Sequence, residues 1–272
     1  VGLGNGRLVA LDASEKREES DFVVGSCQAH ADSLSCCALV ASGPSGSSSS
    51  TLFTASWDGR VKLWALAEGR EPWRTTKKKK DETAPPLPFF ELAGEEPVWS
   101  LACSAHDGGK LVLTGSDDGV VRAWDARVGG SGSGRKSGSG SGGNSSSSSS
   151  FTSSPVCTVR VSNDYVAGLA LLPPSSCPGG VFAVAATADG KLSAVDFRQG
   201  RVVASNDSSS PHPSSSSFSF SIGPLRSLVC DGSLAIAGGE DGRVAFWPVR
   251  EALLSSGKKS GGGGGEGGGG TP

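Results

Sequence analysis

Methionine is absent from this chain of 272 residues, and the sequence lacks three other features that would narrow its class. No run of about 18 apolar residues occurs, so no segment is predicted to cross a membrane as a helix. The first residues do not show the charged and then apolar pattern of a secretory signal peptide. No Cys-x-x-Cys spacing occurs among the seven cysteines, although Cys36 and Cys37 are adjacent. Paired spacings of that kind mark metal and redox sites. Because they are missing from the sequence, we expect reduced thiols in a cytosolic protein, without metal or cofactor.

The charge balance argues against a general nucleic-acid binder. The net charge is −2 and the isoelectric point is near 6.0, whereas such proteins usually carry a basic face. We therefore expect no nucleic-acid partner. At 36% hydrophobic residues, the chain can supply the core of one large all-β domain.

A short hairpin pattern recurs along the chain and organises it. Its clearest copy runs from Leu52 to Trp64, with apolar residues alternating on both sides of Asp58-Gly59. Alternation around Asp-Gly predicts a β-hairpin, because glycine tolerates the positive φ of such turns. Further copies are centred on Asp118-Gly119, Asp189-Gly190 and Asp241-Gly242, and a weaker one on Asn5-Gly6. Once the low-complexity stretches are removed, the period is about 40–50 residues, the length of a four-stranded propeller blade.

The domain prediction is one repeat array over residues 1–250, followed by a disordered Gly-rich tail over residues 251–272. Gly, Ser, Pro and Lys-rich segments at residues 42–50, 70–86, 129–150 and 206–217 are predicted to be insertions between strands, because such compositions cannot bury enough surface to fold. The positive charges of the run Lys77–Lys80 can attract anionic lipid. We favour a solvated loop, since Asp81 and Glu82 follow at once.

The repeated Gly/Ser-x-Asp-Gly-x-Val-x-x-Trp pattern resembles the WD40 β-propeller family. The resemblance implies an all-β propeller with about four complete blades and a partial one. Since the chain lacks methionine and begins inside a half-repeat, we expect it to be a fragment of a seven-bladed ring that lacks its N-terminal part. An open ring of this kind leaves an unpaired blade edge, so we expect residues 1–272 alone to be unstable or to associate.

The same resemblance implies a structural hydrogen-bond network in each blade. In the clearest blade its members are His30, Asp58, Trp64 and a hydroxyl, which is Ser56 or alternatively Thr54. The other blades keep parts of this set, namely Asp118 with Trp124, Asp189 alone, and Asp241 with Trp247. We expect these residues to be structural. A catalytic pair of His30 and Asp58 is disfavoured because no nucleophile lies at a matching spacing.

A closer resemblance is to the C-terminal propeller of BEACH–WD40 proteins of the type called factor associated with neutral sphingomyelinase activation (FAN). It is carried by His30-Ala-Asp-Ser, by residues 55–64 and 187–196 with Val195 in place of the usual tryptophan, and by residues 229–233. It implies a protein-binding scaffold of an adaptor in membrane trafficking or receptor-proximal signalling. Such a protein is cytoplasmic, with peripheral membrane association through domains outside this chain.

Two other functions remain open from the sequence. One is a WD40 subunit of a ubiquitin-ligase or RNA-processing complex. The other is an enzymatic propeller, which is disfavoured because no phosphate-binding loop, metal-ligand cluster or nucleophile elbow is found. We therefore predict no catalytic residues and other proteins as partners. By the resemblance, the loop positions that begin each blade are candidates for partner binding: Asp32, Pro97, Tyr165 and Pro224.

Overall fold

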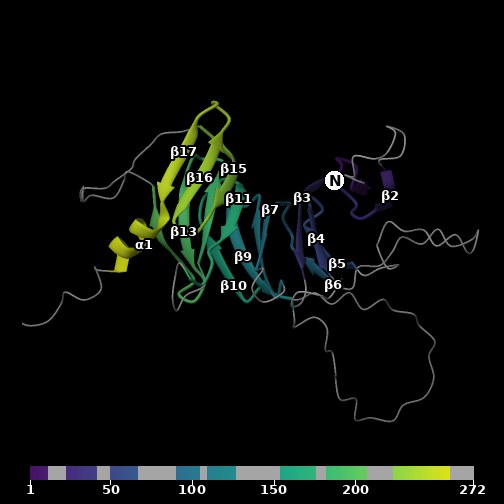
Figure 1. Ribbon diagram of the computed structural model, residues 1–272, viewed down its shortest axis with the longest axis horizontal. Helices are drawn as coiled ribbons and strands as arrows, with labels where there is room; N and C mark the ends of the chain where they lie inside the picture. The colour runs from purple at the N-terminus through teal and green to yellow at the C-terminus, as the bar shows by residue number, and fades with distance from the viewer. Residues whose placement is uncertain are drawn as a thin grey trace, which may run out of the picture.

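The computed structural model describes residues 1–11, 23–41, 50–66, 90–104, 109–126, 154–175, 182–206 and 223–257. Within these residues the chain forms antiparallel β-sheets and one short helix (Figure 1). The all-β prediction is therefore confirmed. The strands are β1 (Arg7–Leu11), β2 (Val23–Gln28), β3 (Leu34–Ala41), β4 (Ser50–Ser56), β5 (Arg60–Leu66), β6 (Phe90–Ala93), β7 (Val98–Cys103), β8 (Leu111–Ser116), β9 (Val120–Asp125), β10 (Cys157–Arg160), β11 (Val166–Leu171), β12 (Phe182–Thr187), β13 (Leu192–Asp196), β14 (Arg201–Ser205), β15 (Leu225–Cys230), β16 (Leu234–Gly239) and β17 (Val244–Pro248).

The strands form sheets of the size expected for propeller blades. Three sheets have four strands in sequence order, β3–β6, β7–β10 and β11–β14. A three-stranded sheet, β15–β17, follows them, and β1 pairs with β2 in a two-stranded sheet before them. The strands β3, β7, β11 and β15 contact one another in that order, so the sheets follow one another around a common inner edge. In Figure 1 the N-terminus lies at the end of this arc opposite β15–β17.

The Asp-Gly turns determine where each hairpin reverses. Gly59 has a φ of +78° and Gly119 a φ of +73°, a region that side chains with a Cβ rarely adopt. A Cβ at Gly119 would also lie 2.2 Å from the carbonyl oxygen of Ser162. The carboxylate of Asp58 completes its turn by accepting a hydrogen bond of 3.0 Å from the backbone N–H of Arg60. Both residues of the dipeptide are therefore needed for the turn geometry.

The core lies between neighbouring sheets, because alternate residues of each strand point to the next blade. In β4 and β5 these residues are Phe53, Ala55, Val61 and Leu63, all at most 2% exposed. They pack with Val98, Val112 and Trp124 of the sheet β7–β10. Burial of a side chain such as Phe53 contributes about 2–3 kcal/mol to folding. The packing of blade against blade thus supplies most of the apolar burial.

The two ends of the arc differ in how they are covered. The sheet β1–β2 packs through Leu8 and Cys27 onto Leu52 and Trp64 of the sheet β3–β6. At the other end, Val244 and Phe246 of β17 are 53% and 57% exposed. Their counterparts Val61 and Leu63, at the same distance after the turn aspartate, are buried by the following blade.

Three boundaries predicted from the sequence need correction. The segment predicted as a tail from residue 251 begins inside the helix α1 (Val249–Gly257), because Val249, Ala252 and Leu253 pack against the core of the last two sheets. Ser50, placed in an insertion, is the first residue of β4 and pairs with Leu66. Asn206, also placed in an insertion, bonds to Leu192 through both its backbone and its side chain. The rest of the predicted insertions, Lys77–Lys80 included, and residues 258–272 lie outside the described residues.

Candidate functional site

The sheet β3–β6 contains a continuous chain of side-chain hydrogen bonds. The indole N–H of Trp64 donates to Thr54 Oγ1 at 2.9 Å, and Thr54 Oγ1 lies 2.8 Å from His30 Nε2. On the other side of the imidazole, His30 Nδ1 lies 3.0 Å from Asp58 Oδ2. Tryptophan can only donate and an ionised carboxylate can only accept. His30 Nδ1 therefore donates to the carboxylate of Asp58, and Thr54 Oγ1 accepts from the indole.

The environment of Asp58 holds its carboxyl group in the charged form. Burial acts to raise the pKa of Asp58, but the hydrogen bond and charge of His30 and the backbone N–H groups of Ala31 and Arg60 outweigh it. The result is a pKa of about 2. His30 itself is 2% exposed. His30 is thus enclosed, with both of its ring nitrogens already engaged, which is the geometry of a structural bond.

Of the two hydroxyls that the sequence offered for this network, Thr54 and not Ser56 contacts His30. The hydroxyl of Ser56 instead donates to the carbonyl oxygen of Asp32 at 3.1 Å and accepts from the backbone N–H of Asp58 at 3.1 Å. Ser56 therefore fastens the turn to the loop before β3. Thr54 and Ser56 point to the same face of β4, and only the pairing of Leu52 with Trp64 places the indole beside Thr54.

The next sheet, β7–β10, repeats this arrangement without the histidine. The indole N–H of Trp124 donates to Thr114 Oγ1 at 2.9 Å, as in the first sheet. The position of His30, four residues before the first residue of the inner strand, is taken by Gly94. A hollow of about 270 Å³, which includes solvent-open space, is lined there by Gly94, Thr114, Ser116, Arg122 and Trp124 among others. Arg122, which lines this hollow, pairs with Asp118 at 2.6 Å.

The remaining two predicted aspartates make contacts within their turns, and Asp241 also contacts the segment before β15. Asp189 accepts a hydrogen bond from the hydroxyl of Thr187 and pairs with Lys191 at 3.1 Å. In that sheet Ala185 and Val195 stand at the positions of Thr54 and Trp64, and both are fully buried. Asp241 accepts from the backbone N–H groups of Gly223 and Arg243. Trp247, also predicted, is 4% exposed and packs in the core.

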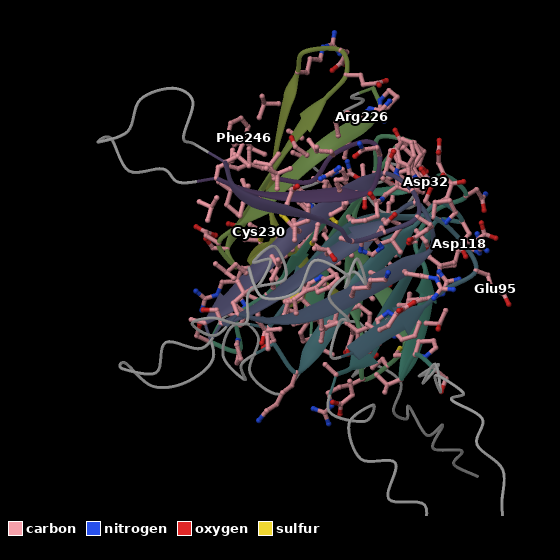
Figure 2. The ribbon with its side chains drawn as sticks, turned by 90° about the vertical axis from the view of Figure 1, so that its right-hand side faces the viewer. Asp32, Glu95, Asp118, Arg226, Cys230 and Phe246 are labelled. Carbon is pink, nitrogen blue, oxygen red and sulfur yellow. The ribbon has the colours of Figure 1, made fainter. Side chains whose placement is uncertain are left out.

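The candidate partner-binding residues lie on one side of the molecule, which we call the loop face. It is the side that carries the Asp-Gly turns and the segments that enter β3, β7, β11 and β15. Pro97, Tyr165 and Pro224 occupy equivalent places there, because each carbonyl oxygen accepts from the residue before a turn aspartate, namely Asp117, Ala188 and Glu240. Asp32 is exposed and lies one residue before Ser33, the equivalent position in the first sheet. Figure 2 shows Asp32, Glu95, Asp118 and Arg226 along this side, and Cys230 and Phe246 on the other.

An aromatic stack crosses the loop face, and sequence reasoning found only one of its members. The rings of Trp57 and Trp99 lie 4.9 Å apart between centroids, and those of Trp99 and Tyr165 lie 4.3 Å apart. The guanidinium of Arg226 lies 5.3 Å from the centroid of Tyr165. We call Trp57, Trp99, Tyr165 and Arg226 the aromatic ladder. Its signal in the sequence is that Trp57 and Trp99 stand outside the third-strand position that Trp64, Trp124 and Trp247 share.

Carboxylates lie along the aromatic ladder, whereas the cations nearby are already engaged. Asp32, Glu95, Glu96, Asp117 and Asp164 are all exposed. In contrast, Arg60 pairs with Glu91, Arg122 pairs with Asp118, and Lys62 donates to the carbonyl oxygen of Ala29 at 2.7 Å. The loop face near Trp57 is consequently acidic as well as aromatic.

The described residues also bear on metal binding and on membrane insertion. Within the described ranges, no three or more His, Cys, Asp or Glu side chains are grouped so that they could hold a metal ion. The helical part of that same region holds no segment long and apolar enough to traverse a bilayer.

The arc of four-stranded antiparallel sheets around a common edge defines a β-propeller type of protein. Residues 22–65 and 88–125 match the family model described as WD domain, G-beta repeat. The two matched segments are similar to WD40 repeats, and the all-β fold of four-stranded sheets is that of a WD40 β-propeller. The matches run from the outer strand of one sheet to the third strand of the next, so each repeat joins two neighbouring sheets. No curated protein matches the chain. WD40 repeats in general indicate a scaffold for protein interactions and are typically non-catalytic.

Proposed function

We propose that this chain is a non-catalytic protein-interaction scaffold whose partner binds the loop face at the aromatic ladder. The observation that carries the proposal is Trp57, which is 41% exposed although its ring is stacked on Trp99. Exposed aromatic rings that are held rigidly are typical anchors of protein interfaces. The ladder is held rigidly because its members come from four successive sheets that pack on one another.

The contacts and the burial of His30 and Asp58 support the absence of a catalytic role. Both ring nitrogens of His30 contact other side chains, and His30 is 2% exposed, so a substrate cannot reach it. The carboxylate of Asp58 accepts from the backbone N–H groups of Ala31 and Arg60 as well. These groups hold the turn and the preceding loop together. The general base and nucleophile that hydrolysis would need are thus not offered by this pair.

The cellular context that we propose is an adaptor of the BEACH–WD40 type at membranes, in trafficking or receptor-proximal signalling, with the protein located in the cytoplasm. Its support is the resemblance of residues 30–33, 55–64 and 187–196 to that family. The sequence of the full transcript tests this context. A BEACH domain upstream is the expected result. An F-box or an RNA-processing module in its place would contradict it and favour a ubiquitin-ligase or RNA-processing subunit.

The scaffold function is tested with two matched variants of the full chain, Trp57→Ala and Phe246→Ala. Both remove an exposed aromatic side chain, but Trp57 lies on the loop face and Phe246 on the opposite side of the molecule in Figure 2. Affinity purification with quantitative mass spectrometry compares the proteins that each variant retains. Proteins that the wild type and Phe246→Ala retain and that Trp57→Ala loses are the expected result. Identical sets of retained proteins for the two variants would contradict the proposal.

A further inference from the structure

The aromatic ladder already holds one guanidinium, at the end formed by Tyr165. Arg226 lies over the Tyr165 ring and contacts its hydroxyl, and it forms an ion pair with Glu240. An aromatic face on one side and a carboxylate on another are the two partners that a guanidinium prefers, by cation–π attraction and by charge-assisted hydrogen bonds. At this end of the ladder, an aromatic ring and a carboxylate of the chain together bind a guanidinium group.

The opposite end of the ladder has the same components without the cation. Trp57 is 41% exposed, and among the described residues the one cation placed over a ring is Arg226 on Tyr165. Trp57 stands at the same position of its turn as Glu240 does in the sheet β15–β17, one residue before the turn aspartate. The indole of Trp57 and the carboxylate that binds Arg226 therefore stand at equivalent positions in different sheets.

Backbone hydrogen bonds tie carboxylate-bearing loops to the turn that carries Trp57. The N–H of Trp57 donates to the carbonyl oxygen of Ser33 at 3.0 Å, next to Asp32. On the other side, the N–H of Gly94 donates to the carbonyl oxygen of Gly59 at 2.8 Å, and Glu95 and Glu96 follow directly. All three carboxylates are exposed, and within the described part of the chain none of them forms an ion pair. Negative charge consequently accumulates on both sides of an exposed indole.

We infer that the Trp57 end of the ladder binds an arginine side chain from a basic segment of the protein partner. The guanidinium stacks on the indole of Trp57, and Asp32, Glu95 and Glu96 supply the opposite charge. Arginine fits better than lysine because its planar group stacks on rings and bonds carboxylates in a bidentate manner. The inference rests on the proposed function, since it names the chemistry of the partner that binds this face.

The test uses the full chain labelled with ¹⁵N and short Gly/Ser peptides that differ in one kind of residue: arginine, lysine, citrulline or glutamate. Citrulline keeps the shape of arginine and removes its charge. The indole N–H signals of Trp57 and Trp99, identified with Trp57→Phe and Trp99→Phe, report binding at the ladder. Saturable shifts of both signals with the arginine peptide, and none with the citrulline or glutamate peptide, are the expected result.

Variants separate the two contributions. Trp57→Ala is expected to weaken binding of the arginine peptide about fivefold, because it removes the cation–π contact. Its affinity is then measured through the Trp99 signal. The triple variant Asp32→Asn, Glu95→Gln, Glu96→Gln is expected to weaken binding about threefold and to make it less sensitive to salt. Phe246→Ala, on the other side of the molecule, leaves the affinity unchanged.

Three results would overturn the inference: no binding of the arginine peptide, equal binding of the citrulline peptide, or an affinity that Trp57→Ala leaves unchanged. Equal binding of the lysine peptide would overturn the assignment to arginine. If the arginine peptide does not bind while Trp57→Ala still loses protein partners in the purification experiment, the scaffold function stands and only the ligand chemistry is wrong. If both experiments fail, the loop face is not the binding surface.

Discussion

The sheets β3–β6 and β7–β10 have the same strand order and the same turn, but they satisfy their turn aspartates in different ways. In the first, Asp58 is bonded to His30, which continues through Thr54 to Trp64. In the second, Asp118 is bonded to Arg122 from the next strand, and a hollow remains beside Thr114. The first arrangement links the turn to β4, to β5 and to the loop before β3, whereas the second closes within one hairpin. A blade of this propeller thus tolerates loss of the histidine where another side-chain donor supports the aspartate.

Removing the histidine from the first sheet is expected to have the largest effect on stability. His30→Ala leaves the carboxylate of Asp58 and the hydroxyl of Thr54 without their shared partner and opens a cavity in their place. We expect a loss of about 3 kcal/mol in the free energy of unfolding. Urea unfolding followed by circular dichroism measures it. Ser162→Ala, at the equivalent position of the sheet β11–β14, is the control and is expected to cost about 1 kcal/mol. Equal losses in the two variants would contradict a special role for the histidine.

A matched pair of threonine variants tests how far the two sheets differ. Thr54 Oγ1 contacts both His30 and Trp64, whereas Thr114 Oγ1 contacts Trp124 in a sheet without the histidine. Valine keeps the shape of threonine and removes the hydroxyl. We expect Thr54→Val to cost about 2 kcal/mol and Thr114→Val about 1 kcal/mol. Urea unfolding of both variants gives the difference, and a larger cost for Thr114→Val would reverse the interpretation of the two networks.

A further test builds the hydrogen-bond network of the first sheet into the second sheet. The double variant Gly94→His, Arg122→Lys reproduces the residues of the first sheet, where lysine stands at residue 62. A Cβ at Gly94 would lie 3.2 Å from the carbonyl oxygen of Gly59, so this oxygen must move by a few tenths of an ångström. We expect a gain of about 1 kcal/mol from filling the hollow and completing the hydrogen bonds.

Thermal unfolding measures this gain, and the single variant Gly94→His is the control. The single variant is expected to gain less, because Arg122 still occupies Asp118. A double variant that is less stable than the wild type would show that the hollow does not accept an imidazole.

The strands and the turns could be predicted from the sequence because they depend on neighbouring residues. Alternation and Asp-Gly give each hairpin locally, and the structure has β5 and β9 directly after those turns. The choice between Thr54 and Ser56 could not be made, since residues two apart on a strand point to the same face. Only the register between β4 and β5 separates them.

The aromatic ladder was beyond prediction for a different reason. Trp57, Trp99 and Tyr165 come from three sheets, and each lies in or beside a loop. Their contacts depend on how the sheets follow one another around the inner edge, which no local pattern encodes. The helix α1 was missed because it borders a Gly-rich tail and is short, and its apolar contacts are with sheets far away in sequence.

The smallest expected difference between the two sheets is their response to acid. Both aspartates have a lowered pKa in the folded protein, although burial opposes the shift, and for Asp58 the value is about 2 against an ordinary 3.8. A carboxyl group with a lowered pKa stabilises the fold above its unfolded pKa, and this contribution is lost as pH falls through the folded value. For Asp58 the loss thus occurs between about pH 4 and pH 2 and amounts to less than about 1 kcal/mol, because the group is partly exposed and screened by solvent.

Asp58→Asn should flatten the dependence of the unfolding free energy on pH in this window, which urea unfolding at several pH values measures. Asp118→Asn is the matched comparison, and we expect it to flatten the dependence less, because the cation that supports Asp118 lies within its own hairpin and Asp58 also binds the N–H of Ala31 in the preceding loop. The same slope in the wild type and in Asp58→Asn would mean that the His30–Asp58 bond contributes nothing to folding in acid.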